Sequence, residues 1–285
     1  MNLLAALVDD AGLFPPASLP MGEALARHRA DEAAGYPMLT HRFLCPASRI
    51  SELRTELAGL VAAAGGAPLR LGVILDTGVD GIDAAQAQIA EDGGLALESL
   101  DVAAPSAEAV GATLGALTRF EAAAFVEGPR DAGWVKVLAG PHPAESSGVP
   151  LRGAKVRCGG ARAELFPSPE ELAAFVCACV EHGVPFKATA GLHGAVRHQD
   201  EQTGFVHHGF LNLLLGAVAA AMGATVGGVT AVLASTDGPA LAAEAGAVPG
   251  RALSAARLLF RSYGSCSTSE PREEAAALGL LDPAA

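Results

Sequence analysis

The segment from residue 154 to residue 189 reads AKVRCGGARAELFPSPEELAAFVCACVEHGVPFKAT. Its two ends, 154–158 and 185–189, mix apolar with charged or polar residues, as strands with one buried face do. Residues 168–182 carry helix signals: Ser168 as N-cap, a proline in the first turn and a glycine just past the end. A strand, a helix and a second strand in this order predict two parallel strands of one sheet.

The same unit recurs along the chain. Earlier strand-like runs cover residues 41–45, 69–75, 95–100 and 120–126, and helical patterns cover residues 49–64, 81–92 and 106–118. These units, with the residues that follow, predict an α/β fold closed into one (β/α)8 TIM-type barrel, which takes ~250 residues. An open doubly wound parallel sheet is the alternative, although no G-x-G-x-x-G motif follows the first strand.

The domain boundary is predicted before the first of these strands. Residues 1–36 form an N-terminal helical extension in this interpretation, and residues 37–285 form the barrel domain. The last strands are poorly marked: residues 225–233 fit a strand or a helix, 251–260 fit a helix, and 262–267 fit a short strand or a loop.

Composition narrows the class of protein and its partners. Hydrophobic residues make up 51% of the chain and charged residues 18%, which excludes a disordered chain. The net charge of −12 argues against nucleic acid or an anionic membrane surface as the main partner. A small-molecule substrate is expected instead, and a homo-oligomer is compatible with the sequence.

Localisation is inferred from the cysteines and the apolar segments. The five cysteines follow no paired spacing, which fits a reducing cytoplasm. The apolar N-terminus has no basic region ahead of it and is not expected to be a signal peptide. Residues 209–236 are uncharged and long enough to span a bilayer, but they lack flanking basic or aromatic residues. We expect them to form buried core.

Candidate site residues are the polar ones at the ends of predicted strands, because barrel active sites lie at the carboxyl ends of the strands. Side-chain alternation places Lys155 with Arg157 on one face of their strand, and Lys187 with Thr189 on one face of theirs. We expect Lys187 and Arg157 to point inward at the same barrel end. Other strand-end candidates are Asp76 and Glu127.

Lysine usage singles out Lys187. The chain has three lysines, Lys136, Lys155 and Lys187, although it has nineteen basic residues in all. A buried lysine can lose its proton and become a nucleophile, which arginine cannot do. We therefore expect a neutral amine on Lys187 that forms an imine. Two alternatives remain open: an ion pair with Glu127 or Asp76, and a contact with an anionic group of the substrate.

A resemblance supports this chemistry. Residues 187–192, KATAGL, resemble the K-[ST]-[ST]-T-G-[FY] segment of deoxyribose-phosphate aldolases, which are class I, Schiff-base barrel enzymes. The resemblance implies that the lysine of the sixth strand forms the Schiff base, and here that lysine is Lys187. No lysine follows Lys187, so the family's second active-site lysine has no counterpart in this chain, and the family's aspartate is not placed by the sequence. The chain as a whole is similar to bacterial barrel proteins of uncharacterised function.

Substrate contacts are expected around the same strands. Gly159 and Gly160 follow Arg157, and their backbone N–H groups fit a phosphate or carboxylate, although glycine also simply permits a turn. With them we group Lys155, Thr189, Asp76 and the polar Asn212, which lies inside an apolar helical pattern.

The histidines suggest a second interpretation. His193, His198, His207 and His208 are close in sequence, but no recognised metal-ligand spacing joins them. We expect no metal and no other cofactor, with His193 as a general acid or base and the polar residues 195–204 as a lid.

The sequence therefore predicts an aldolase-type lyase for a small anionic oxygenated metabolite, with Lys187 as the imine-forming nucleophile and Glu127 or His193 as proton shuttle. One alternative is a metal-assisted hydrolase or isomerase that uses His193, His207 or His208 with Asp76 or Glu127. Another is a barrel that binds a metabolite without catalysis.

Overall fold

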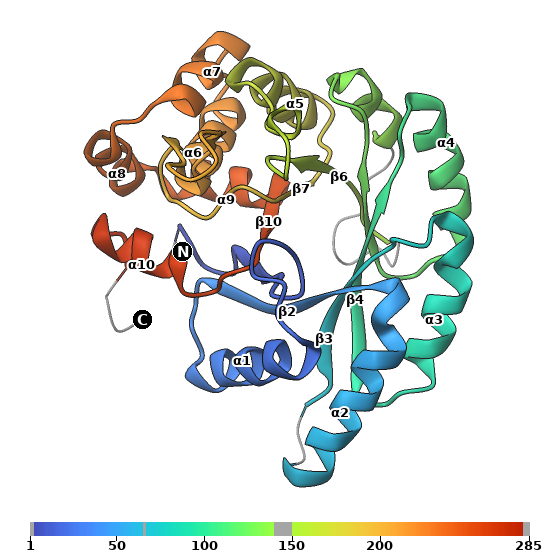
Figure 1. The fold of residues 1–285 in the computed structure, drawn as a ribbon. Coiled ribbons are helices and arrows are strands. Elements are labelled where there is room, and N and C mark those ends of the chain that lie inside the picture. The colour runs from blue at the N-terminus through green and yellow to red at the C-terminus, as the bar shows by residue number, and fades with distance from the viewer. Residues whose placement is uncertain (1–2, 65–66, 140–149, 282–285) are drawn as a thin grey trace.

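The fold is a closed barrel of parallel strands surrounded by helices (Figure 1). The computed structural model describes residues 3–64, 67–139 and 150–281. Around the barrel the strand order is β1-β10-β7-β6-β5-β4-β3-β2, and every neighbouring pair is parallel. The strands are β1 (Val8–Asp10), β2 (Leu39–Pro46), β3 (Leu69–Ile74), β4 (Leu95–Ala103), β5 (Ala123–Glu127), β6 (Arg152–Arg157), β7 (Phe186–Thr189) and β10 (Phe260–Ser265). The predicted TIM-type barrel is confirmed, and the open sheet is not observed.

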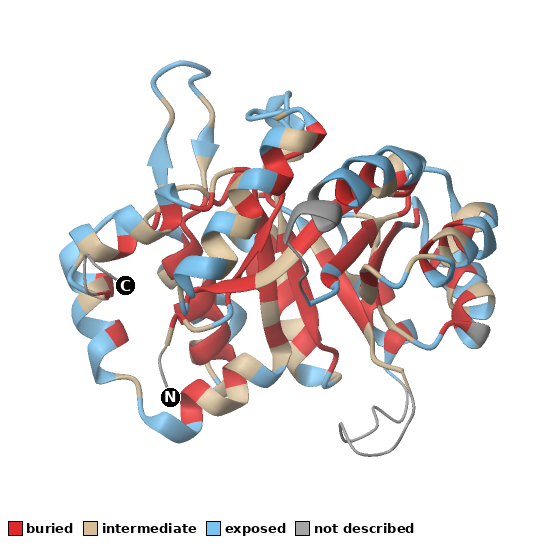
Figure 2. Ribbon diagram, turned by 90° about the horizontal axis from the view of Figure 1, so that it is seen from below, coloured by how far each residue is buried: buried red, intermediate tan, exposed pale blue. Residues whose placement is uncertain are grey.

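Helices cover the outside of the barrel, with their buried faces toward the strands (Figure 2). They are α1 (Met21–Ala34), α2 (Ile50–Ala64), α3 (Ile82–Ala90), α4 (Ala107–Ala116), α5 (Pro169–Glu181), α6 (Phe210–Ala221), α7 (Val226–Ala234), α8 (Gly238–Ala247), α9 (Gly250–Leu259) and α10 (Glu270–Ala277). Helix α5 begins where the sequence predicts, because Ser168 and Glu171 form a capping box that satisfies backbone N–H groups of its first turn. Between β5 and β6 a 3-10 helix, η4 (Ala132–Leu138), covers the barrel.

The predicted N-terminal extension needs a correction. Residues 8–10 are not outside the barrel: they form β1, which closes it by pairing with β10 on one side and β2 on the other. This strand was missed because it is three residues long and two of the three are aspartates, which ordinarily avoid strands. The correction moves each later strand up by one, so Lys155 lies on the sixth barrel strand and Lys187 on the seventh.

The C-terminal part resolves the ambiguous segments. Residues 225–233 belong mostly to helix α7, and the eighth barrel strand is β10, which follows α9 directly. The uncharged segment 209–236 becomes helices α6 and α7. The expectation of buried core is confirmed for α6 but is wrong for α7, in which only Val229 and Leu233 are buried. Among the described residues, none of the helices combines the length and the hydropathy that crossing a bilayer requires.

Inside the barrel, charged side chains occupy positions that branched apolar residues fill in most barrels of this type. Lys155, Lys187, Asp9 and Asp101 are all buried there. A glycine makes room for a ring among them: a Cβ on Gly153 would lie 2.7 Å from the Phe125 ring. The candidate site therefore lies among these buried charged side chains inside the barrel.

Candidate functional site

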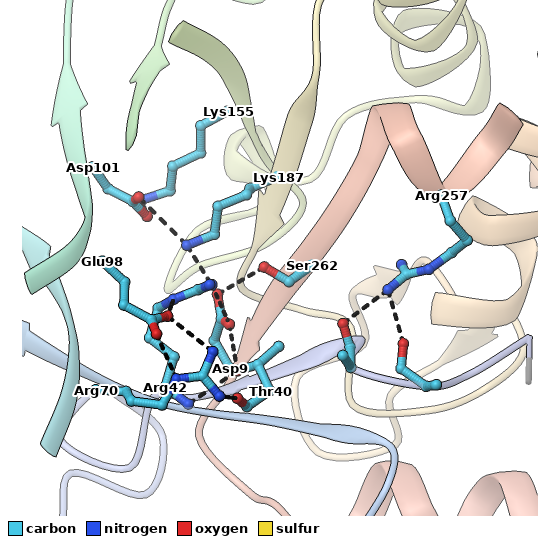
Figure 3. Close-up of polar contacts among 12 residues, drawn as sticks. Asp9, Thr40, Arg42, Arg70, Glu98, Asp101, Lys155, Lys187, Arg257 and Ser262 are labelled. Carbon is cyan, nitrogen blue, oxygen red and sulfur yellow. Dashed lines mark hydrogen bonds and ion pairs between the residues drawn. The ribbon is translucent and has the colours of Figure 1, made fainter. Parts of the chain in front are cut away.

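An unbroken chain of ion pairs runs through the barrel, with cations and carboxylates alternating. Figure 3 shows the part of it from Arg70 to Lys155. In order, its members are Arg70, Glu98, Arg42, Asp9, Lys187, Asp101, Lys155, Glu127 and Arg157. The arginines at its two ends are accessible, since the Arg70 side chain is 46% exposed and that of Arg157 is 43% exposed. The middle is buried, and we call this set of residues the charge chain.

Lys187 lies at the buried centre of the charge chain, with a side chain that is 1% exposed. Its Nζ is 2.9 Å from Asp9 Oδ2 and 3.4 Å from Asp101 Oδ1, and it lies 5.3 Å from the centroid of the Phe125 ring. The expectation of a neutral amine assumed that apolar residues surround Lys187 and that neighbouring cations repel its positive charge. The structure instead gives Lys187 two carboxylate partners, with which it forms buried ion pairs. These partners differ from both candidates, Glu127 and Asp76.

Asp9 is held as a carboxylate. Besides Lys187 it accepts hydrogen bonds from Thr40 Oγ1 at 2.7 Å and Ser262 Oγ at 2.9 Å, and it pairs with Arg42 Nη1 at 2.9 Å. Burial alone would raise the pKa of Asp9, but Lys187, Arg42 and Thr40 outweigh it and lower the pKa from 3.8 to about 2. Asp9 is therefore a fixed anchor for Lys187 and a poor proton acceptor.

Asp101 joins the two buried lysines. Lys155 Nζ lies 3.2 Å from Asp101 Oδ2 and 3.4 Å from Glu127 Oε2, and Lys155 is level with Lys187 on the neighbouring strand. Burial opposes the charge on Lys155, yet Asp101 and Glu127 outweigh burial and raise the pKa of Lys155. Each oxygen of Asp101 thus contacts a different lysine.

Arg157 and Glu127 form the accessible end of the charge chain on the carboxyl side of the strands. Arg157 Nε is 2.8 Å from Glu127 Oε1, and Arg157 pairs in register with Thr189, two residues beyond Lys187. Thr189 faces the interior, because its Oγ1 would lie 3.7 Å from a Cβ on Gly264. Ion pairs therefore connect Arg157 with Lys187, as the shared strand-end position suggested, but Arg157 lies nearer the solvent.

The glycines after β6 have a packing role. A Cβ on Gly159 would lie 2.8 Å from the Cα of Gly191, and one on Gly160 would overlap a methyl carbon of Leu165. Cys158 N–H donates to the Thr189 carbonyl at 2.8 Å, which fixes the two strand ends together. Close backbone approach accounts for Gly159, and contact with the Leu165 side chain accounts for Gly160.

Replacing Gly159 with alanine is expected to lower the free energy of unfolding by about 1–3 kcal/mol, because the new methyl group meets fixed backbone. Gly59→Ala is the control: that glycine lies in α2 with open space around it, and alanine should stabilise the helix by roughly 0.5–1 kcal/mol. Urea denaturation monitored by circular dichroism measures both. Equal effects of the two substitutions would contradict the packing role of Gly159.

The histidines do not join the charge chain. His193 Nδ1 lies 3.3 Å from Glu270 Oε2 and 3.8 Å from Cys266 Sγ, and burial lowers the pKa of His193. His207 packs on the ring of Phe166. Within the described ranges, no group of three or more His, Cys, Asp or Glu side chains is arranged to hold a metal ion. His193 is therefore not positioned by these contacts as a partner of Lys187.

Asp76 and Asn212 have local structural contacts. Asp76 accepts hydrogen bonds from the backbone N–H and hydroxyl of Ser48, just before α2. Asn212 Oδ1 accepts from Arg197 N–H at 2.9 Å, and its Nδ2 donates to the carbonyls of Val232 and Ser235 at 2.8 Å. Neither contacts the lysines in these interactions.

The segment expected to be a lid contains half of a hairpin. Strand β8 (His198–Gln199) pairs antiparallel with β9 (Val206–His207), and the hairpin is mostly exposed to solvent. The sequence did not assign Asp101 to the site, and it favoured a capped turn for Asp9–Asp10 over a carboxylate that enters the site; the structure places Asp9 against Lys187. Comparison with protein-family models found no match for the chain, and comparison with curated proteins found none either.

Proposed function

We propose that this barrel is an aldolase-type lyase that forms an imine between Lys187 and the carbonyl carbon of a small anionic oxygenated metabolite. The observation that carries the proposal is the pair of buried lysines, Lys155 and Lys187, on neighbouring strands around the Asp101 carboxylate. Two of the three lysines in the chain are buried here, where a cation is expensive to desolvate. Such placement is typical of functional rather than surface lysines.

The resemblance to deoxyribose-phosphate aldolases gains support from this arrangement. The sequence alone did not place a second lysine or an aspartate near Lys187. Lys155 and Asp101 are the residues that we propose for those roles, because Asp101 lies within 3.4 Å of both Nζ atoms. The matching motif points to Lys187 as the nucleophile, whereas Lys155 lies on the sixth strand. The experiment must therefore identify the modified lysine.

In the proposed mechanism, Arg157 exchanges Glu127 for the anionic group of the substrate at the accessible end of the charge chain. The Lys155–Glu127 pair then separates and lets the carbonyl group approach Lys187. The Lys187 ammonium gives a proton to Asp101, and the neutral amine attacks the carbonyl carbon. Asp101 returns this proton to the hydroxyl group that leaves as water, which yields the protonated imine. The protonated imine accepts the electron pair of the breaking carbon–carbon bond, while Glu127 takes up the hydroxyl proton and the first product leaves. Glu127 then protonates the resulting enamine at carbon, and water hydrolyses the imine to release the second product and the Lys187 amine.

Borohydride trapping tests the proposal. Pyruvate and glyceraldehyde 3-phosphate serve as carbonyl probes, and peptide mass spectrometry locates the reduced adduct. We expect the adduct on Lys187, and we expect Lys187→Arg to remove it because arginine keeps the charge but cannot form an imine. Lys136→Arg is the matched control, since Lys136 is exposed in η4 and should not affect the adduct.

Two other outcomes are informative. An adduct on Lys155 would assign the nucleophile to the sixth strand. The absence of an adduct on both buried lysines would contradict the imine and favour a barrel that binds anions electrostatically. The metal-assisted alternative has less support, because His193, His207 and His208 do not converge with Asp76 or Glu127 in the contacts described above.

A further inference from the structure

A groove of about 620 Å³ lies outside the charge chain, between the segments that follow β5, β6 and β7. It is lined by Arg130, by Ala163, Glu164 and the residues from Phe166 to Pro169, by Glu171, by Arg197, and by Gly204 to Val206. These segments all follow carboxyl ends of barrel strands, where ligand sites of this fold are built. The volume is within the range of small-molecule sites.

Arg197 contributes an incompletely neutralised positive charge to this groove. Its Nη1 lies 3.2 Å from His208 Nδ1, and His208 Nε2 lies 2.7 Å from the Pro167 carbonyl oxygen. The Nε2–H of His208 therefore donates to Pro167, which leaves Nδ1 to accept from Arg197. Burial lowers the pKa of His208 to about 4, so the imidazole is neutral at pH 7. In the described part of the chain, no carboxylate lies within ion-pair distance of Arg197; Glu170, the acidic residue that acts on it electrostatically, is exposed to solvent.

Unlike Arg197, the other charged side chains that line the groove either form an ion pair or are exposed to solvent. Arg130 Nη1 is 3.0 Å from Glu171 Oε2, and the same oxygen accepts from the Ser168 N–H in the capping box of α5. Those two charges therefore compensate each other. Glu164 is exposed to solvent, so water screens its charge. Arg197 is half-buried and is not paired with a carboxylate in the described residues. An anionic ligand therefore stabilises Arg197 more than it stabilises the other charged side chains of the groove.

Apolar surface lies next to this cation. The rings of Phe166 and Phe205 are 5.3 Å apart, and Val206 is 40% exposed although it is apolar. Pro167 and Pro169 complete this part of the lining. A flat apolar group can pack on these side chains while an attached anion reaches Arg197.

We propose that this groove binds a small molecule with a carboxylate or phosphate group on a flat apolar body, with Arg197 as its anion-binding residue. The proposal does not rest on imine chemistry, because none of the charge-chain residues lines the groove. Binding is measured without turnover, so its failure would leave the proposed lyase untouched.

Isothermal titration calorimetry with phenyl phosphate and with benzoate tests the proposal. We expect both to bind the wild-type protein, and the tighter of the two to identify the anion. Arg197→Gln should weaken binding about tenfold or more, because a charge-assisted hydrogen bond to the anion is lost. Glu164→Gln should tighten binding of the anion, since it removes from the groove a negative charge that repels the ligand. Arg162→Gln is the control: Arg162 is an exposed neighbour outside the lining and should leave binding unchanged.

The contribution of the aromatic lining to binding can be measured separately. Inorganic phosphate should bind more weakly than phenyl phosphate, and Phe205→Ala should reduce that difference. Should Arg197→Gln fail to fold, as judged by circular dichroism, the Glu164 and Phe205 variants still report on the site. The proposal is overturned if neither aromatic anion binds the wild-type protein, or if folded Arg197→Gln binds both as tightly as the wild type.

Discussion

Replacing Asp9 with asparagine is expected to lower the free energy of unfolding by about 3–5 kcal/mol, since removing one partner of a buried ion pair leaves the other charge uncompensated. Asp9 contacts Lys187 at 2.9 Å and Arg42 at 2.9 Å, and the aspartate is fully buried. Asparagine has nearly the same shape, so the loss reports on charge. Asp80→Asn, at an exposed position, is the control and should change stability by less than about 0.5 kcal/mol. Urea denaturation measures both.

The pH dependence of this difference has a definite sign. The pKa of Asp9 is about 2 in the folded protein, below its value of 3.8 in model compounds. Its contribution to stability is therefore fully present above about pH 4 and is lost as the pH falls toward 2, a change of roughly 2–3 kcal/mol. The stability difference between wild type and Asp9→Asn should shrink over this window. A difference that stays constant from pH 5 to pH 2 would show that Asp9 is not held as a carboxylate by these partners.

The barrel could be predicted largely from local patterns, because most strands are apolar runs separated by helices. Strand β1 could not, because two of its three residues are aspartates that are favourable in a strand only when cations meet them inside the closed barrel. Asp101 carries the signal that singled out the lysines, a charge between apolar neighbours, here Leu100 and Val102. The same criterion, applied to acidic residues as well as to lysines, identifies Asp101 as a candidate site residue.

Which of these residues form ion pairs with one another could not be predicted from local patterns. Asp9 and Lys187 are far apart in sequence, and they meet inside the barrel because closure places β1 and β7 on either side of β10. Closure is a property of the whole strand order, which no local pattern contains. The clustered histidines illustrate the converse, since closeness in sequence does not bring His193 and His208 to one site: one contacts Glu270 and the other the Pro167 carbonyl.

The contrast between the two carboxylates of Lys187 leads to a second large effect. Asp9 is held anionic by Arg42 and Thr40 and is a poor proton acceptor, whereas the ion pairs of Asp101 in the described residues are both with lysines. If Asp101 accepts the proton that Lys187 must lose before attack, Asp101→Asn should slow adduct formation at Lys187 at least ~100-fold at pH 7, the lower range for general-base catalysis.

The same substitution should disturb stability less than Asp9→Asn does, because Lys187 keeps Asp9 and Lys155 keeps Glu127. The rate of borohydride-trapped adduct formation, followed by intact mass from pH 6 to pH 9, separates these effects. In Asp101→Asn the rate should rise close to tenfold per pH unit, since hydroxide must then remove the proton from the ammonium. A variant with the wild-type rate and wild-type pH profile would show that Asp101 only positions the lysines, and the proton would then have to leave Lys187 by another route.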